Sequence, residues 1–283
     1  MRSTDGPVGP AEYLEPRCVL CGPPYGEESA VQSIPQKRIL EKLDEYMGRR
    51  DLAGAERHLL YWLEEAKAGN DKRGELLVRG ELIGHFRKTG QREKALEQVD
   101  AALPLLPELG MEETQSAGTT YVNAATACNA FGEDERALDL FARAREIYEA
   151  DDRTAPELLG GLYNNMALTC VALGRYDEAR TFYGRALTAM RKVENGQLEE
   201  AITQLNLASA VEAELGAEAA EEEITKRVEK AYELLTQPYE GEEGYYAFVC
   251  EKCAPSFSYY GFFPMAKELE RRAEEIYRRK QEA

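Results

Sequence analysis

Glycine recurs in this sequence at a fixed interval of 42 residues. Gly90, Gly132, Gly174 and Gly216 are each separated by that distance, and an alanine follows each of the first three after five residues. Apolar residues at steps of three and four lie on both sides of these glycines, which is the spacing of amphipathic helices. We therefore expect a repeated pair of helices, in which glycine supplies the tight backbone conformation that ends the first helix.

Each expected helix carries one apolar stripe. A single pair of helices cannot bury its own stripe, so neighbouring pairs have to stack on one another. No stretch of the chain shows the alternation of apolar and polar residues that is typical of a strand. The sequence therefore predicts an all-α solenoid. In the helix that follows Gly174, the stripe consists of Ala179, Phe182, Tyr183, Ala186, Leu187 and Met190.

The repeat resembles a known family. The strings YNNMA and GRYDEA are similar to the tetratricopeptide repeat of the kinesin-light-chain variety, whose repeat has 42 residues where a standard one has about 34. The resemblance is strongest over residues 76–190 and implies a right-handed α/α superhelix of about six helix pairs. Its residues are Tyr163, Met166, Ala167, Cys170, Gly174, Tyr176, Ala179, Tyr183 and Ala186.

The repeat divides the chain into an arm and a solenoid. Residues 1–34 are rich in proline and glycine and are expected to form a flexible arm, whereas residues 35–283 form the solenoid. Thr236 to Tyr246 is acidic and aromatic and is expected to be a loop before the last pair. The expected pairs span about 35–69, 72–110, 114–151, 155–194, 197–236 and 246–280.

Two pairs depart from the strict interval. In the first pair, alignment on Ala53 would bury Arg57, so we align this pair on Ala55 and accept a shift of two residues. In the fifth pair, Ala220 fits the apolar stripe better by one residue. In the last pair, Gly261 is expected at the turn.

Charge and hydropathy exclude several classes of ligand. The formal net charge is −17, which repels nucleic acid. No apolar run is long enough for a membrane span, and the N-terminal residues lack the apolar core of a secretion signal. We therefore expect a cytoplasmic protein with neither nucleic acid nor membrane as partner. The oligomeric state does not follow from the sequence.

The cysteines suggest a metal site, which the spacing argues against. Cys18 and Cys21 form one CxxC motif, and Cys250 and Cys253 form another. Four thiolates are a common zinc ligand set, but 228 residues separate these motifs, whereas zinc ribbons separate them by about 15–20. Cys250 and Cys253 also fall on an apolar stripe, where small apolar packing explains them. We predict no cofactor, and metal or redox chemistry through Cys18 and Cys21 stays an alternative.

The sequence offers no catalytic constellation. His58 is expected on the solvent side of its helix, and His85 is expected beside the core residue Phe86. Neither histidine has a nucleophile or a second ligand at a suitable spacing. We therefore predict that the protein is not an enzyme.

Asparagines recur at the repeat interval in the first helices. Asn123 and Asn165 are 42 residues apart, as are Asn164 and Asn206. The resemblance implies that such asparagines face a concave groove and hold the backbone of a bound peptide, because an amide offers both a donor and an acceptor. For Asn164 and Asn206, bonding between neighbouring helices is the alternative. The expected groove residues are Arg87, Asn123, Thr126, Asn129, Asn164, Asn165 and Asn206.

These observations favour a protein that binds a protein or peptide partner in a helical groove. One alternative is a peptide-sensing regulator similar to the signal-peptide receptors of Gram-positive bacteria. Such a regulator would lack its own DNA-binding domain here, because residues 1–34 are too short and too rich in proline for a helix-turn-helix. The other alternative is the metal or redox role of Cys18 and Cys21.

Overall fold

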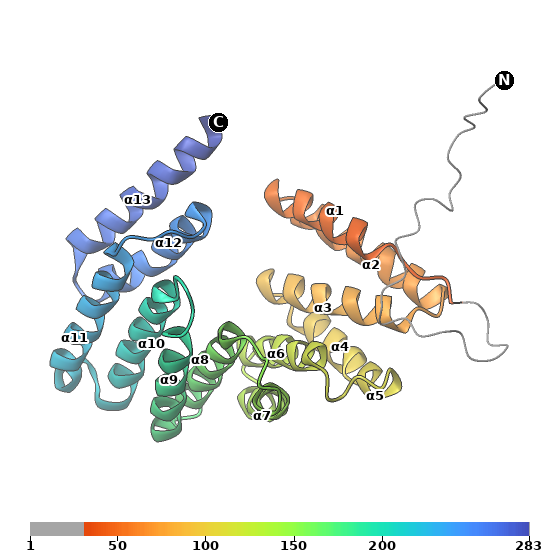
Figure 1. Cartoon of the computed structure of the whole chain (residues 1–283), viewed down its shortest axis with the longest axis horizontal. Helices are drawn as coiled ribbons and strands as arrows, with labels where there is room; N and C mark the ends of the chain where they lie inside the picture. The colour runs from red at the N-terminus through yellow and green to blue at the C-terminus, as the bar shows by residue number, and fades with distance from the viewer. Residues whose placement is uncertain (1–30, 283) are drawn as a thin grey trace. The chain divides into compact units, whose positions relative to one another are not determined.

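The computed structural model describes residues 31–282, with side chains described up to Arg279 (Figure 1). Every regular element in this range is a helix, and the prediction of an all-α fold of sequential helix pairs is confirmed. The helices are α1 (Gln36–Gly48), α2 (Leu52–Ala68), α3 (Lys72–Lys88), α4 (Arg92–Ala102), α5 (Leu105–Glu108), α6 (Gln115–Ala130), α7 (Asp134–Ala150), α8 (Pro156–Ala172), α9 (Tyr176–Met190), α10 (Gln197–Leu215), α11 (Ala217–Thr236), α12 (Glu243–Tyr259) and α13 (Phe263–Glu282).

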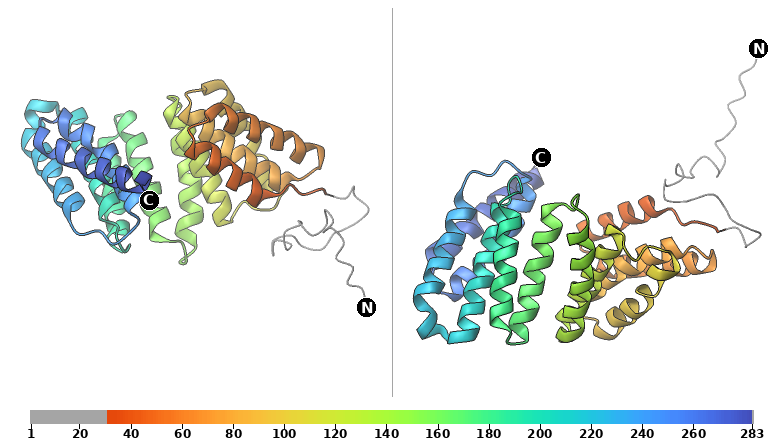
Figure 2. Two further views of the ribbon diagram at one scale, coloured as in Figure 1. Left: turned by 90° about the horizontal axis from the view of Figure 1, so that it is seen from above. Right: turned by 60° about the horizontal axis from the view of Figure 1, so that its bottom comes forward.

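The helices belong to two compact units. The N-terminal unit extends to Glu112 and contains α1–α5, and the C-terminal unit begins at Glu113 and contains α6–α13. Within each unit, every first helix packs against the second helix of its own pair, as in α6 with α7 and α8 with α9. Figure 2 shows the helices of the C-terminal unit lying side by side in chain order.

The expected arm lies largely outside the described residues, which begin at Val31. From there the chain is bonded to the N-terminal unit. The backbone N–H of Gln32 donates to the carbonyl of Gly69 at 3.1 Å, and the N–H of Ile34 donates to a carboxylate oxygen of Asp71 at 2.9 Å. Ile34 is buried, so the last residues before α1 contribute to the core.

The repeated glycines have the backbone conformation that the repeat requires. Each of them ends a first helix with a positive φ, a conformation that other residues adopt only with strain. This explains why glycine, and not another small residue, returns at each turn. The φ values are 71° for Gly90, 77° for Gly132, 70° for Gly174, 81° for Gly216 and 84° for Gly261.

The two departures from the interval have structural causes. In the first turn, Arg50 takes the positive φ (55°) five residues before Ala55, so the turn itself is shifted by two residues. Ala55 is fully buried and Arg57 is exposed, which confirms the alignment on Ala55. Gly216 caps α10 and α11 at once, which makes that turn shorter. The shorter turn accounts for the early position of the buried Ala220.

The expected loop from Thr236 to Tyr246 is shorter in the structure. The helix α12 begins at Glu243, so only residues 237–242 connect α11 to α12. Tyr246 lies inside α12, where its hydroxyl donates to the carbonyl of Leu235 at 2.8 Å. The acidic residues of this stretch were interpreted as loop, but carboxylates also favour a helix N-terminus, where they interact with the helix dipole.

Close helix contacts depend on the absence of a side chain at two positions. A Cβ atom at Gly118 in α6 would overlap the ring of Tyr148 in α7, and one at Gly160 in α8 would overlap the side chain of Met190 in α9. The ring of Tyr148 is fixed by its hydroxyl, which lies 2.9 Å from the Thr119 hydroxyl. The Met190 side chain is flexible and can move aside. Gly118 is therefore the more constrained of the two positions.

We predict that Gly118→Ala destabilises the protein by about 1–3 kcal/mol, because the added methyl group overpacks the contact with Tyr148. Gly161→Ala is the matched control. A Cβ at Gly161 meets no atom within 4 Å, so this substitution should leave stability unchanged or raise it by up to about 1 kcal/mol through helix propensity. Urea unfolding followed by circular dichroism measures both. Equal midpoints for the two variants would contradict this packing account.

Candidate functional site

The first helices of the C-terminal unit form its inner face. The helices α6, α8, α10 and α12 contact one another in succession, whereas the second helices of successive pairs approach one another less closely. A stack of helix pairs curves toward the side on which its helices are closer together, so this side is concave. Figure 1 shows these four helices following one another on one side of the unit. We call their exposed side the inner face.

Asn123 and Asn165 occupy equivalent places on this face. Each lies nine residues before the turn glycine of its own pair, Asn123 on α6 and Asn165 on α8. Asn123 is exposed and Asn165 is half-buried. Between residues 31 and 282, neither side chain forms a hydrogen bond. Both amides therefore keep a donor and an acceptor for a ligand.

Asn164 and Asn206 bond to each other. The Nδ2 atom of Asn206 on α10 donates to the Oδ1 atom of Asn164 on α8 at 3.1 Å. Both residues are half-buried. Their amides thus join successive first helices, which is the alternative that the sequence left open for this pair.

The remaining expected groove residues make local contacts or belong to the other unit. The hydroxyl of Thr126 donates to the carbonyl of Val122 at 2.7 Å, one turn earlier in α6. The Nδ2 atom of Asn129 donates to Asp134 at 2.8 Å, across the turn into α7. Arg87 lies on α3 in the N-terminal unit and is half-buried there. Asn123, Thr126 and Asn165 therefore belong to first helices of the C-terminal unit, whereas Arg87 belongs to the N-terminal unit.

The inner face also has an aromatic part that the sequence analysis missed. Tyr245, Phe248 and Tyr259 on α12 are 39%, 47% and 70% exposed. The rings of Tyr245 and Phe248 stack with centroids 6.3 Å apart, and Nζ of Lys252 lies 5.6 Å from the Phe248 centroid. Lys252 lies nine residues before Gly261, the place that Asn123 and Asn165 hold in their own repeats. The sequence feature that could have predicted this aromatic part is the helical spacing of its residues beside the buried stripe.

Carboxylates of α10 accept hydrogen bonds from these tyrosines. The Tyr245 hydroxyl donates to Glu199 at 2.6 Å, and the Tyr259 hydroxyl donates to Glu212 at 2.9 Å. Tyr260 donates to the second oxygen of Glu212 at 3.0 Å. Burial, followed by the bond to the Glu199 carboxylate, raises the pKa of Tyr245 above its usual value, so this hydroxyl stays a neutral donor. In the described part of the chain, neither Glu199 nor Glu212 forms an ion pair.

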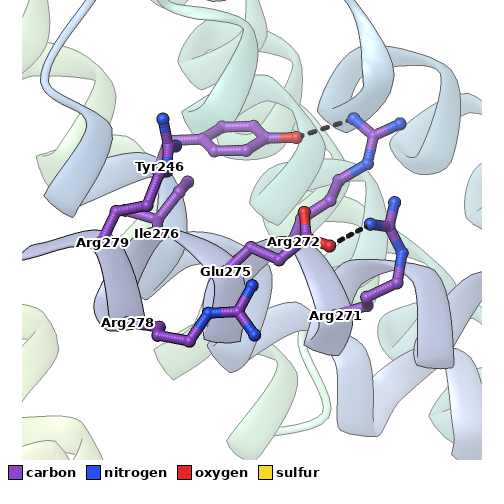
Figure 3. A pocket seen from close by; sticks show the side chains of 7 residues that line it. All are labelled: Tyr246, Arg271, Arg272, Glu275, Ile276, Arg278 and Arg279. Atoms are coloured by element: carbon purple, nitrogen blue, oxygen red, sulfur yellow. Dashed lines mark hydrogen bonds and ion pairs between the residues drawn. The ribbon is translucent and has the colours of Figure 1, made fainter. Parts of the chain in front are cut away.

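The arginine-rich pocket on α13 is a salt-bridge network (Figure 3). Arg271 forms an ion pair with Glu275 at 2.5 Å, and Arg272 forms one with Glu268 at 2.8 Å. Arg272 also donates to the hydroxyl of Tyr246 at 2.9 Å. Carboxylates of α13 itself thus pair with two of the four arginines that line the pocket, and Arg279 pairs with Glu243 of α12 at 3.3 Å, which weakens the attraction of the pocket for an anionic ligand.

The histidines lie in packed surroundings. His58 was expected on the solvent side of α2, but its Nε2 atom lies 3.0 Å from the carbonyl oxygen of Ile39, between α1 and α2. This expectation was wrong because α1 packs against the side of α2 that carries His58. His85 is buried, with Nε2 3.6 Å from a carboxylate oxygen of Glu56. Over residues 31–279, no three His, Cys, Asp or Glu side chains gather as metal ligands.

The described cysteines are buried. Cys128, Cys170, Cys250 and Cys253 all lie in the core, which agrees with a role in apolar packing. Burial raises the pKa of Cys170 to about 11 and that of Cys253 to about 12. Cys18 and Cys21 fall outside the described residues. None of the helices that the structure describes is long and apolar enough to cross a membrane.

The buried thiols should react slowly with alkylating agents. In a Cys18→Ser/Cys21→Ser background at pH 8, we expect iodoacetamide to label the native protein at least about a hundredfold more slowly than the urea-unfolded chain, because the thiolate is the reactive form. Mass spectrometry measures the labelling rates, and similar native and unfolded rates would contradict the assignment.

The raised pKa values of the buried thiols also make stability depend on pH. The folded state holds the thiol protons more tightly than the unfolded chain does. The stability that these protonated thiols contribute is therefore complete below about pH 8.5 and declines as pH rises toward 12.

The bond between Asn164 and Asn206 should contribute to stability. Asn206→Ala removes the donor to Asn164, which we expect to cost about 1 kcal/mol, whereas Asn123→Ala should change stability by less than about 0.5 kcal/mol. Chemical unfolding of both variants tests the difference. If Asn123→Ala cost as much as Asn206→Ala, the distinction between paired and unpaired amides would be wrong.

Comparisons with known proteins agree with this architecture. Residues 158–237 match a tetratricopeptide repeat family, and no curated protein matches the chain. The solved structure of NprR in complex with its cognate peptide NprX is similar at 16% identity, covering 84% of this chain and 66% of that one, with a TM-score of 0.56. The apo form of RapI is similar at 15% identity, covering 88% and 100%, with a TM-score of 0.50.

A kinesin-light-chain-like protein with nearly identical repeats from Podosopora anserina is also among the similar structures. It has 18% identity, covers 72% of this chain and 96% of that one, and has a TM-score of 0.49. Residues 158–237 of the chain thus consist of tetratricopeptide repeats, as the residues around Gly174 predicted.

Proposed function

We propose that the protein is a non-enzymatic scaffold that binds a peptide segment of a partner on the inner face of its C-terminal unit. The observation that carries this proposal is the pair of unengaged amides, Asn123 and Asn165, at equivalent places on successive first helices. Packed helices lie about 8–10 Å apart, and an extended peptide advances about 3.3 Å per residue. About three residues of such a peptide therefore span the two amides.

An amide side chain suits this task because it matches a peptide unit. Its N–H group can donate to a backbone carbonyl while its oxygen accepts from a backbone N–H, whatever side chains the ligand carries. Leu168 is 37% exposed on α8 and offers an apolar contact one turn beyond Asn165. The site thus combines sequence-tolerant backbone bonding with apolar contact, which is a usual mode of peptide recognition.

The comparison with NprR supports a peptide as the ligand, because that protein shares the fold and was crystallised with its cognate peptide. It also favours a second candidate function, a peptide-sensing regulator whose shape responds to the ligand. Small-angle scattering with and without a bound peptide separates the two roles, since a static scaffold keeps its radius of gyration. A metal or redox role for Cys18 and Cys21 remains a third proposal, which zinc analysis with and without Cys18→Ser tests.

Peptide selection from a random library tests the scaffold function. We expect a peptide selected on the wild-type protein to bind Asn123→Ala/Asn165→Ala at least about tenfold more weakly, because two hydrogen bonds of about 1 kcal/mol each are lost. Fluorescence anisotropy measures the affinities.

The matched control is Thr181→Ala/Thr188→Ala on α9. These hydroxyls bond only to carbonyls of their own helix, at 3.0 and 2.8 Å, so this variant should bind as the wild type does. Equal affinity of all three proteins for every selected peptide, with unchanged melting temperatures, would show that the inner face is not the binding site.

A further inference from the structure

The inner face changes its chemistry along the C-terminal unit. On α6 and α8 it carries the amides of Asn123 and Asn165, whereas on α12 it carries aromatic rings, with carboxylates of α10 beside them. We call this second part the aromatic–acidic surface, and it consists of Glu199, Glu212, Tyr245, Phe248 and Tyr259.

The surface is an elongated strip. Tyr245 in the first turn of α12 bonds to Glu199 in the first turn of α10, and Tyr259 at the end of α12 bonds to Glu212 in the last turn of α10. The two helices therefore run parallel, with a tyrosine–carboxylate pair near each end. At a rise of 1.5 Å per residue, the two tyrosines are about 20 Å apart along α12, with Phe248 between them. This length matches about four turns of a helical peptide.

The exposed rings are unusual within the unit. A soluble protein exposes few large apolar side chains close together without a use for them. Exposed large apolar residues of the described C-terminal unit are Leu168, Leu215, Tyr245, Phe248, Tyr259 and Phe263, and three of these six lie on α12. The concentration on one helix face points to a contact surface.

The charged residues around the strip indicate the sign of the charge that a partner should carry. Glu199 and Glu212 bond to tyrosine hydroxyls, which leaves both negative charges uncompensated among the described residues. Glu200 on α10 differs, since it forms an ion pair with Arg191 at 3.1 Å. Lys252 places one positive charge over the Phe248 ring, which offsets part of the charge of the two carboxylates. The net charge of −17 adds a negative field that attracts cations and repels a second copy of this chain.

We propose that the aromatic–acidic surface binds a cationic amphipathic segment of the partner, in which lysine or arginine alternates with apolar side chains. The apolar side chains pack on Phe248 and on the tyrosine rings, which are the residue types that contribute most to binding at interfaces. The cationic groups pair with Glu199 and Glu212 and contact the tyrosine faces. This inference rests on the proposed function, because it names the chemistry of the segment that the inner face takes.

Three labelled peptides of about 15 residues test the chemistry. One contains lysine and leucine at amphipathic helical spacing, the second replaces each lysine by glutamate, and the third replaces each leucine by serine. In fluorescence anisotropy titrations we expect the lysine–leucine peptide to bind at least tenfold more tightly than either of the others, with an affinity that falls as salt increases. Equal affinity of the lysine–serine peptide would show attraction by net charge alone and would overturn the proposal, as would tighter binding of the glutamate peptide.

Two double variants locate the site. Phe248→Ala/Tyr259→Ala should lower the affinity for the lysine–leucine peptide at least tenfold. Glu199→Gln/Glu212→Gln should lower this affinity about three- to tenfold and reduce its dependence on salt. Their matched controls are Phe263→Ala, which removes another exposed ring, and Glu221→Gln/Glu222→Gln, which removes the same charge from exposed positions of α11. Both controls should bind as the wild type does. Melting curves verify that all variants are folded.

The outcomes separate this inference from the proposed function. If library-selected peptides depend on Asn123 and Asn165 but ignore the aromatic and acidic variants, the inference is wrong and the scaffold function stands. If the lysine–leucine peptide binds and responds to the variants while Asn123→Ala/Asn165→Ala has no effect on any peptide, the amide site is wrong. If the control variants weaken binding as much as the site variants, the aromatic–acidic surface is not the docking site.

Discussion

The burial of apolar stripes between successive helices is the interaction on which the rest of this structure depends. In the last two pairs, residues of α10, α11, α12 and α13 form one continuous core that includes Leu205, Val228, Phe257 and Leu269. No pair of helices covers its own stripe completely, so each pair is stabilised by the next. In the five pairs after the first, glycine with a positive φ makes this stacking possible, because it reverses the chain between the two helices without a side chain in strained geometry.

The same packing leaves one side of the first helices exposed. Because the apolar stripe of each first helix faces the neighbouring helices, the opposite side of the helix stays exposed along the unit. Residues on that side are not needed for core packing. Such positions vary between repeats, from the amide of Asn165 to the cation of Lys252, each nine residues before its turn glycine. A regular scaffold thus presents an irregular chemical surface, which is how repeat proteins of one fold come to bind different partners.

Hydrogen bonding divides the asparagines into two groups with different roles. Asn164 and Asn206 are adjacent to the core stripe, where an unpaired amide would cost free energy, and they bond to each other. Asn123 is exposed and Asn165 is half-buried, and neither amide is hydrogen-bonded within the described part of the chain. The tyrosine–carboxylate pairs of α12 and α10 combine both roles, because each joins two helices while its carboxylate keeps a negative charge at the surface.

Local spacing alone determined the helices, their buried stripes and the glycine turns, because each of these follows from residues within one repeat. The alignments on Ala55 and Ala220 could also be predicted from the sequence, since only one choice keeps charged groups such as Arg57 out of the core. The tertiary structure decided which asparagines pair, where His58 lies and that the rings of α12 remain uncovered. These features depend on how closely neighbouring helices approach, and that distance is set by side chains some 40 residues away, which no local pattern contains.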